Sequence, residues 1–196
     1  ETISIVEHGT LNIDNYITDT CKKTGCDHAY YNGHWYSGFG PGPTFIALPI
    51  YLAIYPFLEY LIPRDLFGNE KFEIKLILLN ILATIFISSL LAALTSVFVY
   101  KVSRYFTDNE KNRLITTFSL CFATIYFLYS TGYYARILGV FFSLFAFYKL
   151  IEMKHSYVNN KDLFLSGLFS SIAISMDYPH FIISGILFFY LFSYLR

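Results

Sequence analysis

Apolar residues are concentrated in six runs that follow a polar segment, residues 1–43. A helix needs about 20 apolar residues to cross a bilayer. The run at 76–100 is long enough by itself, and the last four predict two helical hairpins with turns at TGYYAR (131–136) and MDYP (176–179). The pattern predicts an all-α membrane protein with about five transmembrane helices, at 76–100, 114–130, 135–151, 163–176 and 180–195.

The composition agrees with a membrane protein. Of 196 residues, 55% are hydrophobic and 14% are charged, and the mean hydropathy is +0.47. Soluble domains carry about 25% charged residues. These values exclude a soluble enzyme, a disordered tail and a nucleic-acid binder. The chain begins without Met and ends directly after an apolar run, so we expect it to be part of a longer protein.

The first run, 44–62, allows two topologies because it contains Pro49, Pro56 and Glu59. Proline inside a helix removes a hydrogen bond and kinks the chain. The run either crosses the membrane or lies along its surface, and the choice decides the side of residues 1–43. A bent, aromatic-rich helix suits the headgroup level. We therefore predict an extracytoplasmic loop at 1–43, an interfacial helix with a connector at 44–75, and a transmembrane region at 76–196.

Basic residues indicate the orientation. Loops 101–113 and 149–161 are rich in Lys and Arg, whereas Arg136 is the only basic residue in the turns at the opposite ends of the helices. Residues 1–75 carry nine acidic and five basic residues, unlike a cytoplasmic flank. By the positive-inside rule, the two basic loops face the cytoplasm and residues 1–75 lie outside.

The polar segment holds most of the candidate chemistry. Asp14 is the candidate catalytic carboxylate, with the cap of a turn or short helix as the alternative. His34 and Tyr36, with Trp35 between them, are candidates for binding a sugar through hydrogen bonds and ring stacking. An interfacial aromatic cluster explains them almost as well.

Cysteine and histidine residues suggest two further features. Cys21 and Cys26 bracket a tight CKKTGC loop, which suits a disulfide in an oxidising compartment. Cys26, Asp27, His28 and His34 are close in sequence, so a divalent metal is possible. The sequence contains no HExxH or CxxC spacing, and we predict neither a metal-ligand set nor a cofactor.

Arg136 is the candidate residue for binding the phosphate of a substrate. An ionised group near membrane depth is costly and indicates function by default. The planar guanidinium suits a phosphate bidentately. Asp177 lies at the same outer level on the next hairpin and is a second substrate-binding candidate. The alternative is that the two residues only pair with each other.

Two segments, SIVEHGTLNID and YNGHWYSGFGPGPTFIALPIYL, resemble the first external loop of polytopic glycosyltransferases of the GT-C class. That class includes the protein O-mannosyltransferases and the aminoarabinose transferase acting on lipid A. The resemblance implies transfer of a sugar from a polyprenyl-phosphate carrier to a protein or lipid, outside the membrane. The apolar layout continues the likeness to residue 196, but only NGHWYSGFGPG is a moderately specific motif.

The chain departs from this family in two ways. The family's catalytic carboxylate lies at the start of the first external loop, a position that would fall before Glu1. Gly40 stands where the aminoarabinose-type enzymes place a basic residue. We therefore predict a glycosyltransferase fragment whose partners are membrane lipids and a polyprenyl-phosphate sugar. The alternative is a non-catalytic subunit of a larger membrane complex. A transporter or channel is weaker because the predicted spans hold almost no ionisable residues.

Overall fold

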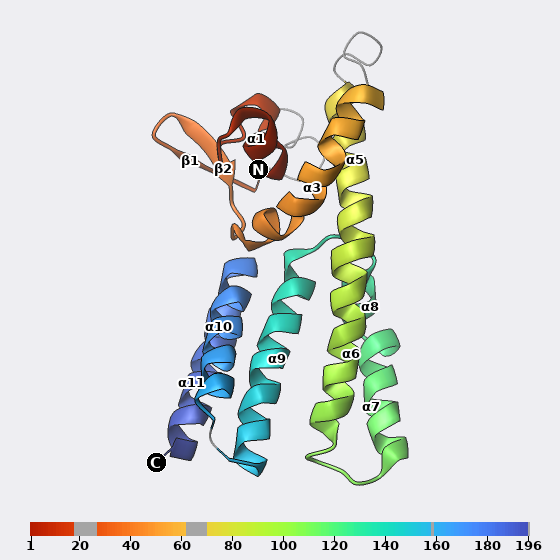
Figure 1. The fold of residues 1–196 in the computed structure, drawn as a ribbon, viewed down its shortest axis with the longest axis vertical. Helices are drawn as coiled ribbons and strands as arrows, with labels where there is room; N and C mark the ends of the chain where they lie inside the picture. Colours follow the sequence, from red (N-terminus) through yellow and green to blue (C-terminus); the bar gives the residue numbers. More distant parts are fainter. Residues whose placement is uncertain (18–26, 62–69, 158, 196) are drawn as a thin grey trace. The chain divides into compact units, whose positions relative to one another are not determined.

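The computed structural model describes residues 1–17, 27–61, 70–157 and 159–195 (Figure 1). The chain divides into two compact units, Glu1–Ala83 and Thr84–Arg196. It is mostly helical, as predicted, but the polar segment contains a two-stranded sheet, so the all-α prediction is wrong at this point. Cys21 and Cys26 lie outside the described residues.

The first unit contains more regular structure than the predicted loop. Its elements are α1 (Thr2–His8), η1 (Asp14–Tyr16), β1 (His28–Tyr31), β2 (His34–Ser37), α3 (Gly42–Leu61) and α5 (Glu70–Ala83). The two strands pair antiparallel, with Tyr31 opposite His34. Asn32 and Gly33 connect them with φ of 48° and 86°. This is the Asn-Gly signal of a two-residue hairpin turn, in which both central residues take positive φ.

An ion cluster joins α1, η1, α3 and α5. The carboxylate of Glu7 accepts hydrogen bonds from the hydroxyls of Tyr16 at 2.8 Å and Tyr51 at 3.0 Å, and from the ammonium of Lys75. Lys75 also donates to Glu59 at 2.6 Å, and its side chain is 5% exposed. Burial alone would raise the pKa of Glu7, but the bonds from Lys75, Tyr16 and Tyr51 outweigh it and lower that pKa. The ammonium of Lys75 therefore pairs with the carboxylates of both Glu7 and Glu59.

The first predicted span lies within a longer helix. One helix runs over Phe72–Ser103 and contains α5 from Phe72 onward, the π-helical segment η2 (Thr84–Ser88) and α6 (Ser89–Ser103). Among the described residues, this helix and α3 are long and apolar enough to cross a membrane. The same length and composition also occur in core helices of soluble proteins.

The second unit continues with α7 (Glu110–Ala123), α8 (Ile125–Ser130), α9 (Ala135–His155), α10 (Asn160–Met176) and α11 (His180–Leu195). The prediction of one helix over 114–130 is wrong, because the backbone at Thr124 is extended (φ −126°, ψ 170°) and interrupts the helix. The Thr124 hydroxyl donates to the carbonyl of Leu120 at 2.7 Å and accepts from the amide of Tyr126 at 3.2 Å. It thus closes one helix and caps the next.

Helices α9, α10 and α11 lie side by side (Figure 1) and share an apolar core. Ala146, Leu150, Met153 and Leu187 form its buried centre. Arg136 lies in the first turn of α9, and His155 is the last residue of this helix.

Candidate functional site

The segment around η1 brings Asp14 onto strand β2. Oδ2 of Asp14 lies 2.6 Å from Nδ1 of His34, and Oδ1 accepts a hydrogen bond from the amide of Trp35 at 2.7 Å. The amide of Ile13 donates in turn to the carbonyl of Trp35 at 2.8 Å. These contacts fix the imidazole ring of His34 and commit both carboxylate oxygens.

The hydrogen bonds of Asp14 favour a role in orienting His34. The hydrogen bond from His34, together with the bond from the Trp35 amide, lowers the pKa of Asp14. When a carboxylate accepts a hydrogen bond from Nδ1–H of a neutral imidazole, Nε2 is the free acceptor. The His34 side chain is 51% exposed, so that acceptor can reach a proton on an incoming molecule.

Strand geometry divides the three residues that sequence analysis grouped as a sugar site. Successive side chains of a strand point to opposite faces. His34 and Tyr36 therefore share one face of β2, while Trp35 lies on the other. There its ring contacts Tyr30, its partner across the hairpin, with centroids 4.8 Å apart. The hairpin thus keeps His34 and Tyr36 together and presents a separate exposed aromatic pair.

The hairpin also separates the residues considered for a metal. His28 pairs with Ser37 and His34 pairs with Tyr31, so the two histidines lie at opposite ends of the strands. Three steps along a strand span roughly 10 Å. Among the described residues, no group of three His, Cys, Asp or Glu side chains is arranged to hold a metal ion. Cys26 lies outside that part of the chain.

In the second unit, Arg136 and Asp177 come together as one of the two sequence interpretations expected. Nε of Arg136 lies 3.8 Å from Oδ2 of Asp177, and Nη1 donates to the hydroxyl of Tyr129. The Arg136 side chain is 64% exposed, whereas that of Asp177 is 18% exposed. Within the described residues, Nη2 has no hydrogen-bond partner. The pair therefore leaves one guanidinium edge open to an anion.

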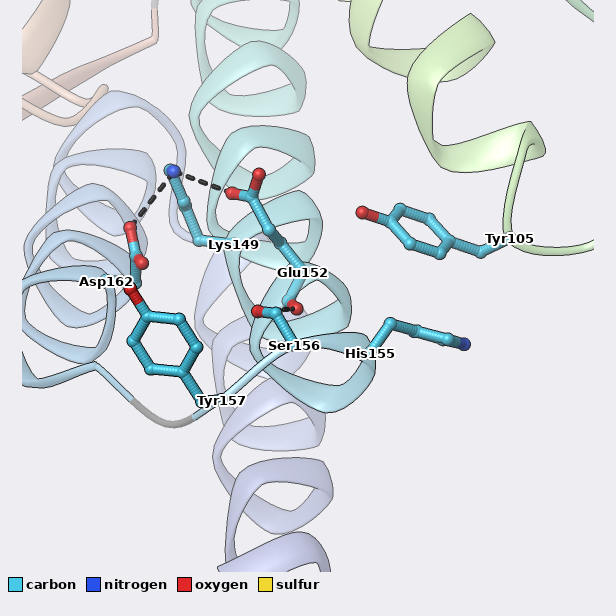
Figure 2. Close-up of a pocket in the computed structure, with 7 residues that line it drawn as sticks. All are labelled: Tyr105, Lys149, Glu152, His155, Ser156, Tyr157 and Asp162. Atoms are coloured by element: carbon cyan, nitrogen blue, oxygen red, sulfur yellow. Dashed lines mark hydrogen bonds and ion pairs between the residues drawn. The ribbon is translucent and has the colours of Figure 1, made fainter.

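A polar pocket of about 420 Å³ lies at the other end of α9 (Figure 2). Nζ of Lys149 lies 2.7 Å from Oε2 of Glu152 and 3.0 Å from Oδ1 of Asp162. The remaining lining residues are Tyr105, His155, Ser156 and Tyr157. Lys149 binds both carboxylates, and its ion pair with Asp162 links α9 to α10. We assign the pocket no reaction.

Two features were missed by sequence reasoning. The Glu7–Lys75 contact joins residues 68 positions apart, which no motif could indicate. His180 is buried at 5% exposure and binds Ser143. The signal for His180 was present in the sequence, since a histidine follows MDYP at the start of an apolar run.

The chain was compared with protein-family models, with curated proteins and with solved structures, and none of them matches it. The assignment of a function therefore depends on the residues and contacts described above.

Proposed function

We propose that the chain is a membrane glycosyltransferase that moves a sugar from a polyprenyl-phosphate carrier to a protein or lipid acceptor on the extracytoplasmic side. The observation that carries the proposal is the Asp14–His34 pair, an exposed imidazole oriented by a carboxylate. Transfer to a hydroxyl needs such a group to remove the acceptor's proton.

Exposure of the apolar helices supports a membrane location. The most apolar stretches of α3 and of Phe72–Ser103 are only 17% and 22% buried. A core helix of a soluble protein is mostly buried, since exposed apolar surface is unfavourable in water. Lipid contact accounts for this exposure directly.

The two faces of α3 support a position along the membrane surface. Its buried residues are Gly42, Ala47, Tyr51 and Leu58. Its exposed face is apolar along the whole helix and comprises Phe45, Pro49, Leu52, Ala53, Pro56, Phe57, Tyr60 and Leu61. The exposed apolar face can rest in lipid while the opposite face packs on protein, as in a helix that lies along the surface.

The prolines favour the same position. Pro49 and Pro56 have no amide hydrogen, so the carbonyls of Phe45 and Leu52 lose their usual helical donor. In hydrocarbon an unsatisfied carbonyl costs several kcal/mol, whereas water in the headgroup zone can satisfy it. A surface position for α3, with basic loops 101–113 and 149–161 in the cytoplasm, leaves His34 outside.

The proposed reaction is a displacement at the anomeric carbon. The acceptor oxygen forms the new bond to this carbon while its proton passes to Nε2 of His34. The bond to the carrier oxygen breaks, and its electron pair leaves with the polyprenyl phosphate. In the second unit, and as a separate proposal, the guanidinium of Arg136 suits an anionic phosphate oxygen. The roles of His34 and Arg136 rest on separate units and are tested separately.

The test is a transfer assay in membrane vesicles with a panel of radiolabelled polyprenyl-phosphate sugars. H34A should lower kcat by about 10²- to 10⁴-fold, the usual contribution of a general base, with an unchanged KM for the donor. The matched control is H155A, which replaces an exposed histidine of the second unit. Wild-type rates in H34A, or no transfer from any of these donors, would contradict the proposal.

A non-catalytic subunit of a membrane complex is the second candidate. It is favoured by the outward apolar residues of α11, among them Phe181, Ile182, Ile186, Phe189 and Phe192, each more than 60% exposed. Partner helices could cover this face as well as lipid does. Purification in mild detergent distinguishes the two candidate functions. A partner that co-purifies in stoichiometric amount, together with an H34A variant that behaves like the parent, would support the subunit.

A further inference from the structure

One stripe of α9 contacts the segment that joins α10 to α11. Arg136, Gly139 and Ser143 are spaced three and four residues apart, so they lie on one face of the helix. Arg136 pairs with Asp177, at the end of α10, while Gly139 and Ser143 contact His180, the first residue of α11. The stripe thus joins the exposed ion pair to a buried polar contact.

His180 is held closely on this stripe. Its Nδ1 lies 2.8 Å from the hydroxyl oxygen of Ser143, and both side chains are buried. A Cβ atom at position 139 would lie 2.3 Å from Nε2 and 2.4 Å from Cδ2 of the ring. The imidazole therefore occupies the space that the missing side chain of Gly139 leaves.

The backbone links the ring to the ion pair. The amide of His180 donates to the carbonyl of Asp177 at 3.0 Å, which closes the turn between α10 and α11. This bond connects the first residue of α11 directly to Asp177. Burying an imidazole costs free energy that an apolar residue would avoid. Other buried or half-buried serines of this bundle, Ser166 and Ser184, bind backbone carbonyls instead.

We propose that His180 is a positioning residue, which docks on Gly139 and Ser143 and so keeps Asp177 opposite Arg136. The inference rests on the proposed function only for the identity of the anion that Arg136 receives. The geometric part concerns the second unit alone.

The geometric part is tested by thiol bridging in the full-length protein in membranes. R136C and D177C are combined in a background where Cys21, Cys26 and Cys121 are serine, and a short bifunctional thiol reagent is added. Intact mass gives the ratio of bridged to doubly modified protein. H180A should lower this ratio by about threefold or more, because the docked turn becomes a smaller part of the ensemble. H180N keeps a polar partner for Ser143, so its ratio of bridged to doubly modified protein should be closer to that of the parent.

Glycine variants provide a matched control. G139A places a methyl group in the ring's position and should lower bridging as H180A does. G167A adds the same methyl group in α10, where nothing lies within 4 Å, and should leave bridging unchanged. Equal bridging in H180A and the parent, or an equal loss in G139A and G167A, would overturn the inference.

Binding of undecaprenyl phosphate in nanodiscs then separates this inference from the proposed function. R136K should weaken binding about tenfold, because an ammonium lacks the bidentate fork. H180A should weaken binding in the parent and add little in R136K, since a residue that acts through Arg136 is not additive with it. If R136K has no effect, the proposed phosphate role fails, while the bridging result still decides the role of His180.

Discussion

Nδ1 of His34 lies 2.6 Å from Oδ2 of Asp14, while the Trp35 amide occupies the other carboxylate oxygen at 2.7 Å. This relationship changes the role that sequence analysis gave to Asp14. A carboxylate that accepts two hydrogen bonds and has a lowered pKa is a poor proton acceptor. In the proposed transfer, His34 is therefore the proton acceptor and Asp14 orients its ring.

The first prediction follows from this division of roles. D14N should lower kcat of the proposed transfer by about tenfold or more, because an amide nitrogen can present the wrong partner to Nδ1. In H34A the same change should add little, since the two residues act as a unit. The double-mutant cycle in the vesicle assay measures this, with D108N in an exposed loop as the control. Additive losses would show that Asp14 acts independently of His34.

The second prediction concerns the ion cluster of the first unit. K75M removes the cation shared by Glu7 and Glu59 and leaves both carboxylates without it. Removing one partner of a buried pair costs about 3–5 kcal/mol. Thermal unfolding in detergent should show this loss. K161M, at an exposed position in the first turn of α10, should change stability little. Equal effects of the two variants would contradict a buried role for Lys75.

The third prediction concerns the acid sensitivity of the same cluster. The folded pKa of Glu7 lies below its ordinary value of 4.5. A group with a depressed folded pKa contributes stability that is present above the unfolded value and is lost as pH falls through the folded value. The parent should therefore lose stability below about pH 4.5, and E7Q should lose less over that range. A parallel pH dependence in both proteins would contradict the cluster.

The fourth prediction concerns the hairpin turn. Gly33 has φ of 86°, and a side chain there is strained by about 1–2 kcal/mol. G33A should increase hydrogen exchange of the amides within 28–37. In G167A, a helical position with open space, exchange of these amides should stay at the parent level. Unchanged exchange in G33A would mean that the hairpin does not need this turn.

Much of the helical layout could be predicted from the sequence, because long apolar runs have few alternatives. The structure places helices over most of 76–100, 135–151, 163–176 and 180–195. The break at Thr124 could not be predicted, since apolar residues continue on both sides of it. The hairpin was predictable from Asn32 and Gly33, but the polar segment was interpreted as a loop.

The residues of the two candidate pairs could be singled out from the sequence, but their contacts could not. Asp14, His34, Arg136 and Asp177 were singled out by residue type and position. The pairing of Asp14 with His34 spans 20 residues, and it depends on a sheet register that spacing does not encode. His180 was overlooked because its burial arises from a glycine on another helix. Contacts of this kind depend on packing.

We propose that α3 lies along the outer membrane surface and keeps the Asp14–His34 pair outside. Nitroxide labels at positions 45, 52 and 60, each as a single cysteine in a background without native cysteines, report depth by electron paramagnetic resonance. The 20-residue helix is about 30 Å long, enough to cross the hydrocarbon core. If α3 lies along the surface, the labels at all three positions should have similar, shallow depths. A label at 52 near the bilayer centre, with 45 and 60 near opposite surfaces, would contradict it.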